Sequence, residues 1–85
     1  MYIHLGGEYV VAQNQIIGIF DLENTTVSKK TREFLNLSEK RNEVINVSYE
    51  LPKSFVVTSK NKKTKVYISQ ISPTTLNKRL GIIVK

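Results

Sequence analysis

The chain has 85 residues and contains no cysteine, so neither a disulfide nor a thiolate-bound metal can stabilise its fold. Its single histidine, His4, argues against a zinc site built from histidines. A chain of this size buries only about 60% of the surface of its unfolded state, and such domains are marginally stable without further support. The sequence therefore predicts one domain over residues 1–85 that gains stability by association with copies of itself, as a homo-oligomer.

The composition is that of an ordinary globular protein, with 40% hydrophobic and 24% charged residues. The longest apolar runs, at residues 16–20 and 80–84, are far shorter than the roughly 20 residues needed to cross a bilayer. No basic residue precedes Lys29, so the N-terminus lacks the pattern of a signal peptide. We therefore expect a cytoplasmic protein that does not bind a membrane.

Charge is unevenly distributed along the chain, although the total is +6. Residues 1–28 contain three acids and no base, and residues 29–50 contain five bases and four acids. Residues 51–85 contain eight bases and no acid. A basic surface of this kind is typical of proteins that bind nucleic acid, because neutralised phosphates release condensed counterions. Solubility alone also explains a net charge of about 2 to 8 in a small domain, so that interpretation stays open.

The first twenty residues contain three short runs of strand-forming residues. A glycine pair at residues 6–7 separates the runs 2–5 and 9–12 and supplies the positive φ of a hairpin turn. The run 15–20 is apolar on both faces, which predicts a central buried strand. Gly18 within this run indicates a bulge or a close approach of the backbone by a neighbour. The chain is thus expected to begin as a small antiparallel sheet.

An amphipathic helix is predicted over residues 29–41. Ser28 can serve as its N-cap, because the hydroxyl of a serine in this position accepts a backbone N–H of the first turn. Residues at helical spacing form its inner face: Thr31, Phe34, Leu35 and Ser38. Asn36 and Asn42 are expected to weaken or end it.

A second helix is predicted after Ser72, which is followed by proline, the residue favoured at the first helical position. Leu76 and Leu80 lie four residues apart and form its buried stripe, and Gly81 is expected to end it. The apolar tail at residues 82–84 needs a partner surface.

Between the two helices, three strands are predicted at residues 44–49, 54–58 and 64–71. The last two form a hairpin around a lysine-rich turn at residues 59–63. Together these elements give an α+β fold with a small antiparallel sheet and two helices.

The residues offer no combination typical of an enzyme. The sequence has no cysteine nucleophile, no glycine-rich phosphate loop followed by lysine, and no dinucleotide fingerprint. A hydrolase would require His4 as general acid or base, but a strand histidine without catalytic neighbours is better explained as a packed or edge residue. We therefore expect a non-enzymatic protein with no cofactor, metal or small-molecule substrate.

The candidate DNA-binding residues are all basic and come from the C-terminal part of the chain: Lys53, Lys60, Lys62, Lys63, Lys65, Lys78 and Arg79. Lysine suits contacts to phosphate, whereas base readout depends more on arginine, asparagine and glutamine. We therefore expect contacts to the backbone of double-stranded DNA with little sequence preference. Tyr67 could stack on a base, but a tyrosine in a strand more often packs within its sheet.

Four segments, in this order, point to one protein family: MYIHLG at residues 1–6, VV with IIGIFD within residues 10–21, PKSFVVT at residues 52–58 and SQISPTTLNKR at residues 69–79. They resemble the extracellular-matrix regulators of Firmicutes (RemA/RemB-like), and most of all the RemB branch. The resemblance covers nearly the whole chain. It implies an α+β subunit of a ring-shaped homo-oligomer around which DNA wraps, with a surface similar to a LytTR-type DNA-binding domain. It also implies a role in regulating the transcription of biofilm matrix genes.

Two positions differ from the RemA branch of this family. Gln15 stands where that branch has an arginine, and Lys53 is the only base in the loop 50–53, where that branch has an arginine cluster. A second interpretation therefore stays open. In it, the chain is a structural or protein-interaction module that co-assembles with a DNA-binding paralogue and binds little DNA itself.

Overall fold

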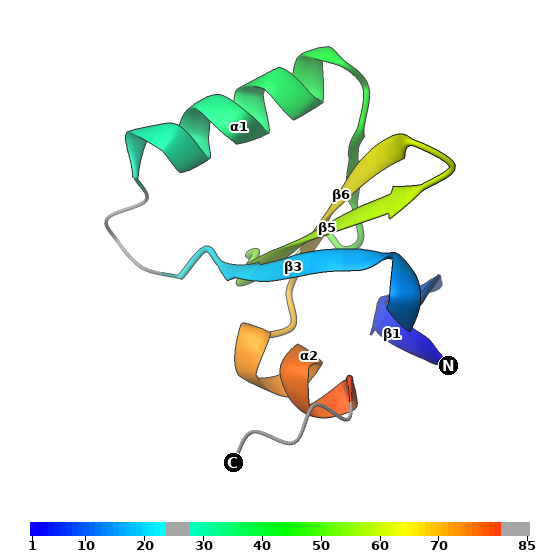
Figure 1. Ribbon diagram of the computed structural model, residues 1–85. Helices are drawn as coiled ribbons and strands as arrows, with labels where there is room; N and C mark the ends of the chain where they lie inside the picture. The colour runs from blue at the N-terminus through cyan, green and yellow to red at the C-terminus, as the bar shows by residue number, and fades with distance from the viewer. Residues whose placement is uncertain (24–27, 81–85) are drawn as a thin grey trace.

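The computed structural model describes residues 1–23 and 28–80. Its elements follow in the order β1 (Tyr2–Gly6), β2 (Tyr9–Ala12), the short 3-10 helix η1 (Gln13–Gln15), β3 (Ile16–Asp21), α1 (Lys29–Lys40), β4 (Val44–Asn46), β5 (Ser54–Lys60), β6 (Lys63–Ser69) and α2 (Pro73–Arg79) (Figure 1). β1 and β2 form a two-stranded sheet, and the other strands form a four-stranded sheet in the order β3-β5-β6-β4. The predicted α+β class is confirmed.

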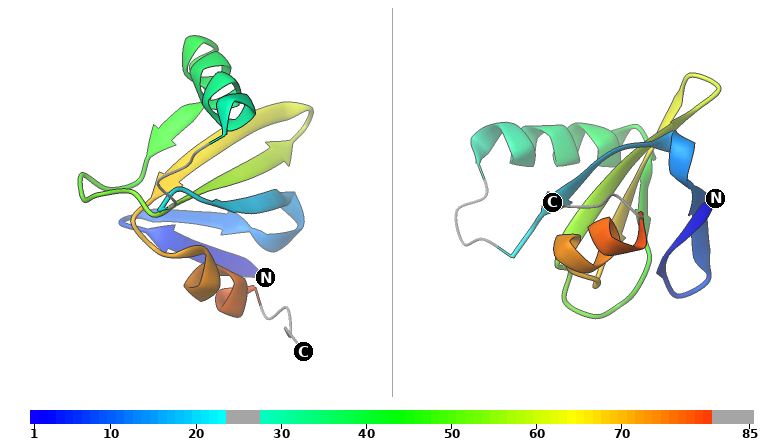
Figure 2. Two further views of the ribbon diagram at one scale, coloured as in Figure 1. Left: turned by 90° about the vertical axis from the view of Figure 1, so that its left-hand side faces the viewer. Right: turned by 60° about the horizontal axis from the view of Figure 1, so that its bottom comes forward.

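The four-stranded sheet lies between two covering layers. α1 lies over one face, and α2 and the β1-β2 hairpin cover the other (Figures 1 and 2). Successive residues of a strand point to opposite faces, so Val56 of β5 packs with Leu5 and Leu76, whereas Val57 packs with Leu35 of α1. The core is therefore divided into two clusters by the sheet.

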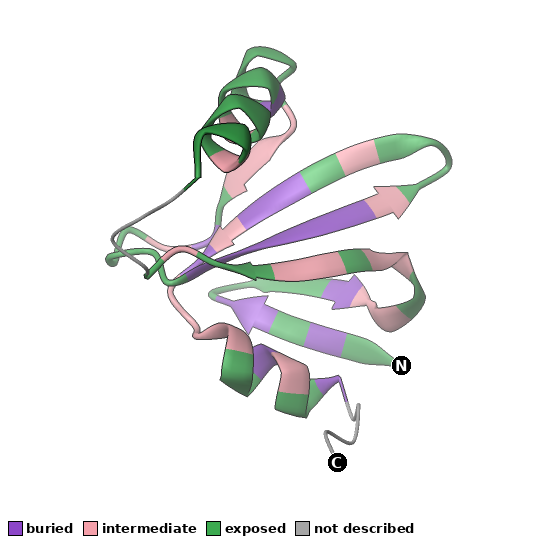
Figure 3. Cartoon of the chain, turned by 60° about the vertical axis from the view of Figure 1, so that its left-hand side comes forward, coloured by how far each residue is buried: buried purple, intermediate pink, exposed green. Residues whose placement is uncertain are grey.

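β3 is an edge strand, so the prediction of a central buried strand at residues 15–20 is wrong. It pairs only with β5, and its side chains Ile17 and Phe20 are 65% and 46% exposed. The centre of the sheet is formed by β5 and β6, whose residues Val56 and Val66 are fully buried (Figure 3). Apolar residues on both faces of a strand show neither how many strands flank it nor whether both of its faces are covered.

Glycines lie at the hairpin turn and at the bulge, the two features that were predicted for them near the N-terminus. Gly6 and Gly7 have φ values of +119° and +53°, which confirms the hairpin turn between β1 and β2. The bulge predicted at Gly18 is also confirmed, because the register of β3 against β5 shifts there. A Cβ atom at Gly18 would lie 2.7 Å from the ring of Phe20, so this ring lies against the bare backbone.

β4 differs from the prediction in length and direction. It is shorter than the expected strand at residues 44–49 and pairs parallel to β6, so the sheet is mixed and not purely antiparallel. β3 and β5 are antiparallel, as are β5 and β6, so β3 and β4 run in the same direction. The helix α1 therefore joins two parallel strands at opposite edges of the sheet, which is the kind of connection that parallel strands require.

The first helix begins after Ser28 as predicted, continues through Asn36 and ends before Asn42. The hydroxyl of Ser28 accepts the backbone N–H of Thr31 at 3.1 Å, and Asn42, beyond the C-cap, has a positive φ of 58°. Ser38 on the inner face is buried, but Phe34 is 38% exposed. Part of the predicted inner face of α1 is therefore open to solvent.

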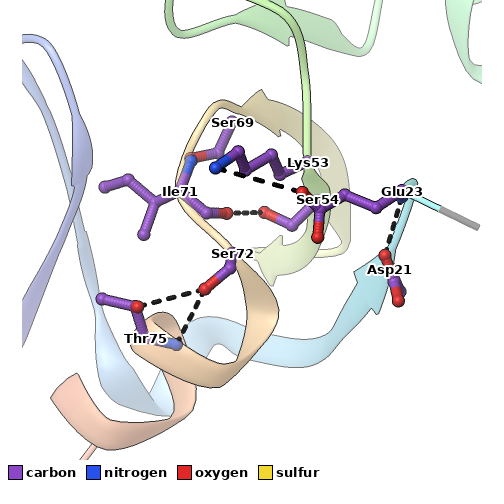
Figure 4. Close-up of polar contacts among 8 residues, drawn as sticks. All are labelled: Asp21, Glu23, Lys53, Ser54, Ser69, Ile71, Ser72 and Thr75. Carbon is purple, nitrogen blue, oxygen red and sulfur yellow. Dashed lines mark hydrogen bonds and ion pairs between the residues drawn. The ribbon is translucent and has the colours of Figure 1, made fainter.

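The second helix has the predicted cap and the predicted buried stripe. The Ser72 hydroxyl accepts the N–H of Thr75 at 3.3 Å (Figure 4), and Leu76 and Leu80 are buried. The predicted stop at Gly81 and the apolar tail at residues 82–84 lie outside the described residues.

Two buried serines tie the layers together. The Ser69 hydroxyl donates to the carbonyl of Leu5 at 2.7 Å and accepts the N–H of Ile71 at 3.0 Å. The Ser54 hydroxyl donates to the carbonyl of Ile71 at 2.7 Å (Figure 4). These bonds join β1, β5 and the segment that leads into α2.

Candidate nucleic-acid interface

The β5-β6 hairpin ends in a tight turn that bears the largest group of candidate DNA-binding residues. Asn61 and Lys62 form the turn and have φ values of 52° and 65°. Positive φ at both central residues is the property of a type I′ turn, whose twist matches that of the flanking strands. Lys60 and Lys63 pair across this turn. The hairpin projects beyond the rest of the sheet (Figures 1 and 2).

We call Lys60, Lys62, Lys63 and Lys65 the lysine tip. All of them are exposed, and none forms an ion pair within the part of the chain that the structure describes. Lys60 lies directly opposite Lys63, and like charges opposite each other destabilise a sheet. Lys65 follows two residues after Lys63 and therefore lies on the same face of the hairpin. The tip thus gathers repelling cations that an anionic partner would stabilise.

Lys53 lies far from the lysine tip. It immediately precedes β5, whereas Lys60 ends that strand, and at about 3.3 Å per residue the two Cα atoms are roughly 23 Å apart. Its Nζ atom lies 4.0 Å from a carboxylate oxygen of Glu23 (Figure 4). The charge of Lys53 is therefore partly balanced within the subunit.

Lys78 and Arg79 lie in the last turn of α2, which packs against β1 and β3 and lies away from the lysine tip (Figures 1 and 3). Arg79 donates from Nη1 to the carbonyl oxygen of His4 at 2.9 Å and so joins α2 to β1. His4 in turn donates from Nε2 to the carbonyl of Gly7 at 2.7 Å, within its own hairpin. His4 therefore has a structural role in the turn, as expected for an edge histidine.

Tyr67 packs within the protein, as tyrosines in strands commonly do. It is 9% exposed, and its ring meets the ring of Tyr9 edge-on, with the centroids 6.1 Å apart. Burial raises the pKa of the Tyr67 hydroxyl above its ordinary value of 10.0, and the nearby Tyr9 contributes to the same shift. A ring held in this way has no free face for a nucleic-acid base.

Neither a metal centre nor a membrane-spanning helix is found among the described residues. In residues 1–23 and 28–80 no group of three or more histidine, aspartate or glutamate side chains is placed to hold a metal ion. No helix in the same ranges is long and apolar enough to span a bilayer.

The structure also contains a groove that the sequence did not predict. It lies between α1 and β3, has a volume of about 340 Å³, and is lined mostly by apolar side chains, among them Ile17, Phe20 and Phe34. The groove is open because β3 is the last strand on its side of the sheet. Gly18 could have indicated from the sequence that this strand lies at an edge of the sheet, because bulges are frequent at sheet edges.

These elements define a small α+β domain with a projecting cationic hairpin. A family model described as RemA-like, extracellular matrix regulatory protein A-like, matches residues 2–80. The chain is 40% identical over 79 residues to extracellular matrix regulatory protein B of Bacillus subtilis (strain 168), an alignment that covers 93% of this chain and 89% of that protein. The chain therefore belongs to the RemA-like family of extracellular matrix regulatory proteins, and the resemblance seen in its sequence is confirmed.

Proposed function

We propose that the protein is a non-enzymatic, cytoplasmic transcriptional regulator of biofilm and extracellular-matrix genes that binds the backbone of double-stranded DNA through the lysine tip. The observation that supports this proposal is the gathering of exposed, unpaired lysines on a projecting hairpin in the described structure. Membership in a family of matrix regulatory proteins supports the regulatory role.

The geometry of the hairpin fits a duplex. A two-stranded ribbon can enter the major groove of B-DNA, and lysines on its face and at its apex then lie near the phosphates. Binding would release counterions and relieve the repulsion between Lys60 and Lys63. Lysines act as point charges on phosphate, so little sequence preference is expected from a single tip.

Assembly strengthens this interaction in the proposal. A ring-shaped homo-oligomer presents one lysine tip per subunit, and contacts that are weak singly become strong when they are linked. Lys78 and Arg79 give a second, smaller cationic site on each subunit. Lys53 contributes least, because Glu23 partly balances its charge.

A gel-shift titration with purified protein and duplex DNA tests the proposal. Charge reversal of Lys60, Lys62 and Lys63 to glutamate should abolish the shift on all duplex sequences. A matched control reverses the same number of charges elsewhere, on or next to α1, by changing Arg32, Lys40 and Arg41 to glutamate. If net charge alone mattered, both variants would lose binding equally. Full retention of DNA binding by the tip variant would refute the assigned surface.

The alternative function is a structural module that co-assembles with a DNA-binding paralogue. The loop that follows β4 favours this alternative, because it exposes Tyr49 and Leu51 to solvent and its Lys53 is paired with Glu23. In that case the protein alone should give no shift at low salt. It should shift DNA only when the paralogue is present.

A further inference from the structure

The apex of the lysine tip carries one residue that differs in chemistry from the lysines around it. Asn61 has the only carboxamide among residues 59–65, and it is exposed at the end of the hairpin. None of the side-chain hydrogen bonds found in residues 1–23 and 28–80 involves this carboxamide. Its N–H donors and its carbonyl oxygen are therefore available to a binding partner.

The backbone holds Asn61 at the first central position of the turn. Its φ is 52°, and Lys60 and Lys63 pair with each other below it. Asparagine tolerates this left-handed conformation better than most residues, so the turn alone is enough to explain an asparagine here. Glycine adopts the same conformation without strain and lacks the carboxamide. One substitution therefore separates a role of Asn61 in the turn from a role in binding.

The lysines around Asn61 fit an arrangement in which its side chain meets the edge of a base. Lys60, Lys63 and Lys65 project from one face of the hairpin, which extends beyond the rest of the sheet (Figures 1 and 2). The major groove of B-DNA is about 12 Å wide, admits a two-stranded ribbon and is bordered by phosphates on both sides. When lysines of the ribbon contact these phosphates, its apex points to the floor of the groove.

We propose that Asn61 recognises adenine in the major groove. The carboxamide N–H donates to N7 of the base, and the carboxamide oxygen accepts from the N6 amino group. Guanine presents two acceptors at this edge, so the oxygen of Asn61 would face an acceptor there. The inference rests on the proposed binding of DNA by the lysine tip and names the base that the tip prefers. Phosphate contacts remain the main source of affinity, because the lysines supply the charge.

Replacement of adenine by 7-deazaadenine tests this contact at the level of one atom. The modified base pairs with thymine as adenine does, but a C–H group replaces the N7 acceptor. Two labelled duplexes of the same sequence, one with each base, are titrated with the purified full chain and followed by fluorescence anisotropy. The wild type should bind the adenine duplex about 5-fold more tightly, which is the effect expected from the loss of one hydrogen bond.

Two substitutions at neighbouring positions separate recognition of the base from charge. Asn61→Gly keeps the positive φ and removes the carboxamide, so it should bind both duplexes equally and with an unchanged dependence on salt. Lys62→Gly is the matched control, because it changes the other central residue of the turn and removes a charge. It should bind both duplexes more weakly and with a shallower dependence on salt, yet it should keep the preference for adenine.

The outcomes distinguish this inference from the proposed function. Equal affinity of the wild type for the two duplexes would overturn the recognition of adenine, and so would an Asn61→Gly variant that keeps the preference. Either result leaves the proposed DNA binding intact, because the lysines still bind phosphate. A wild-type protein that binds neither duplex at low salt overturns both.

Discussion

The turn at the apex of the lysine tip gives a prediction in which stability and binding change in opposite directions. Lys62 has a φ of 65°, a left-handed conformation that costs a residue other than glycine roughly 1–2 kcal/mol. Glycine has no such cost, but its freedom in the unfolded chain costs about 0.5–1 kcal/mol. Lys62→Gly should therefore stabilise the protein by roughly 0.5–1 kcal/mol, which raises Tm by about 2–8 °C.

The same substitution removes a cation from the proposed DNA surface. Affinity for duplex DNA should fall, and the slope of log affinity against log salt should become shallower by about 1 for each phosphate that the protein no longer neutralises. Lys65→Gly is the matched control. It removes the same charge from the extended strand β6, where glycine destabilises by about 0.5–1 kcal/mol.

Thermal and urea unfolding of both variants, followed by DNA titrations at several salt concentrations, give the two readouts. The structure predicts opposite signs of the stability change and the same direction of the binding change. If Lys62→Gly were less stable than the wild type, the left-handed turn described above would be refuted. If it were more stable but bound DNA unchanged, the lysine at the apex would have no part in binding.

Three further changes test the interior. Ser69→Ala removes the hydrogen bonds to Leu5 and from Ile71 and should cost roughly 1–3 kcal/mol, so an unchanged urea midpoint would speak against them. Leu76→Ala should cost about 2–5 kcal/mol, enough to leave much of the protein unfolded, which circular dichroism would detect. The raised pKa of Tyr67 favours the protonated folded state, so stability should fall as pH rises above about 10, and Tyr67→Phe should weaken that fall in alkaline melts.

Features set by neighbouring residues could be predicted from the sequence. The helix caps at Ser28 and Ser72 depend on groups only three residues away, and the turn at Gly6-Gly7 depends on those two glycines. A short stretch of sequence therefore contains all that is needed to predict each of them. The β5-β6 hairpin was predictable for the same reason. This local signal also placed the lysine tip, since Lys60 and Lys63 flank the turn.

Features set by the choice of strand partner could not be predicted. The run at residues 15–20 has the same apolar pattern whether one strand or two strands flank it, so its position at the edge was missed. The direction of β4 depends on the path of α1 across the sheet, which no local pattern encodes. This long-range arrangement also determines the groove between α1 and β3, the pairing of Lys53 with Glu23 and the distance of Arg79 from the lysine tip.

The measurement that tests the proposed function most directly is the salt dependence of DNA binding. Fluorescence anisotropy of a labelled duplex, titrated with the purified protein at several salt concentrations, gives the affinity at each. Binding to the backbone by the lysine tip predicts that log affinity falls linearly with log salt, on unrelated sequences alike. Binding should be lost at every salt concentration when Lys60, Lys62 and Lys63 are reversed to glutamate. Absence of binding at low salt, or an affinity that does not change with salt, would contradict the proposed function.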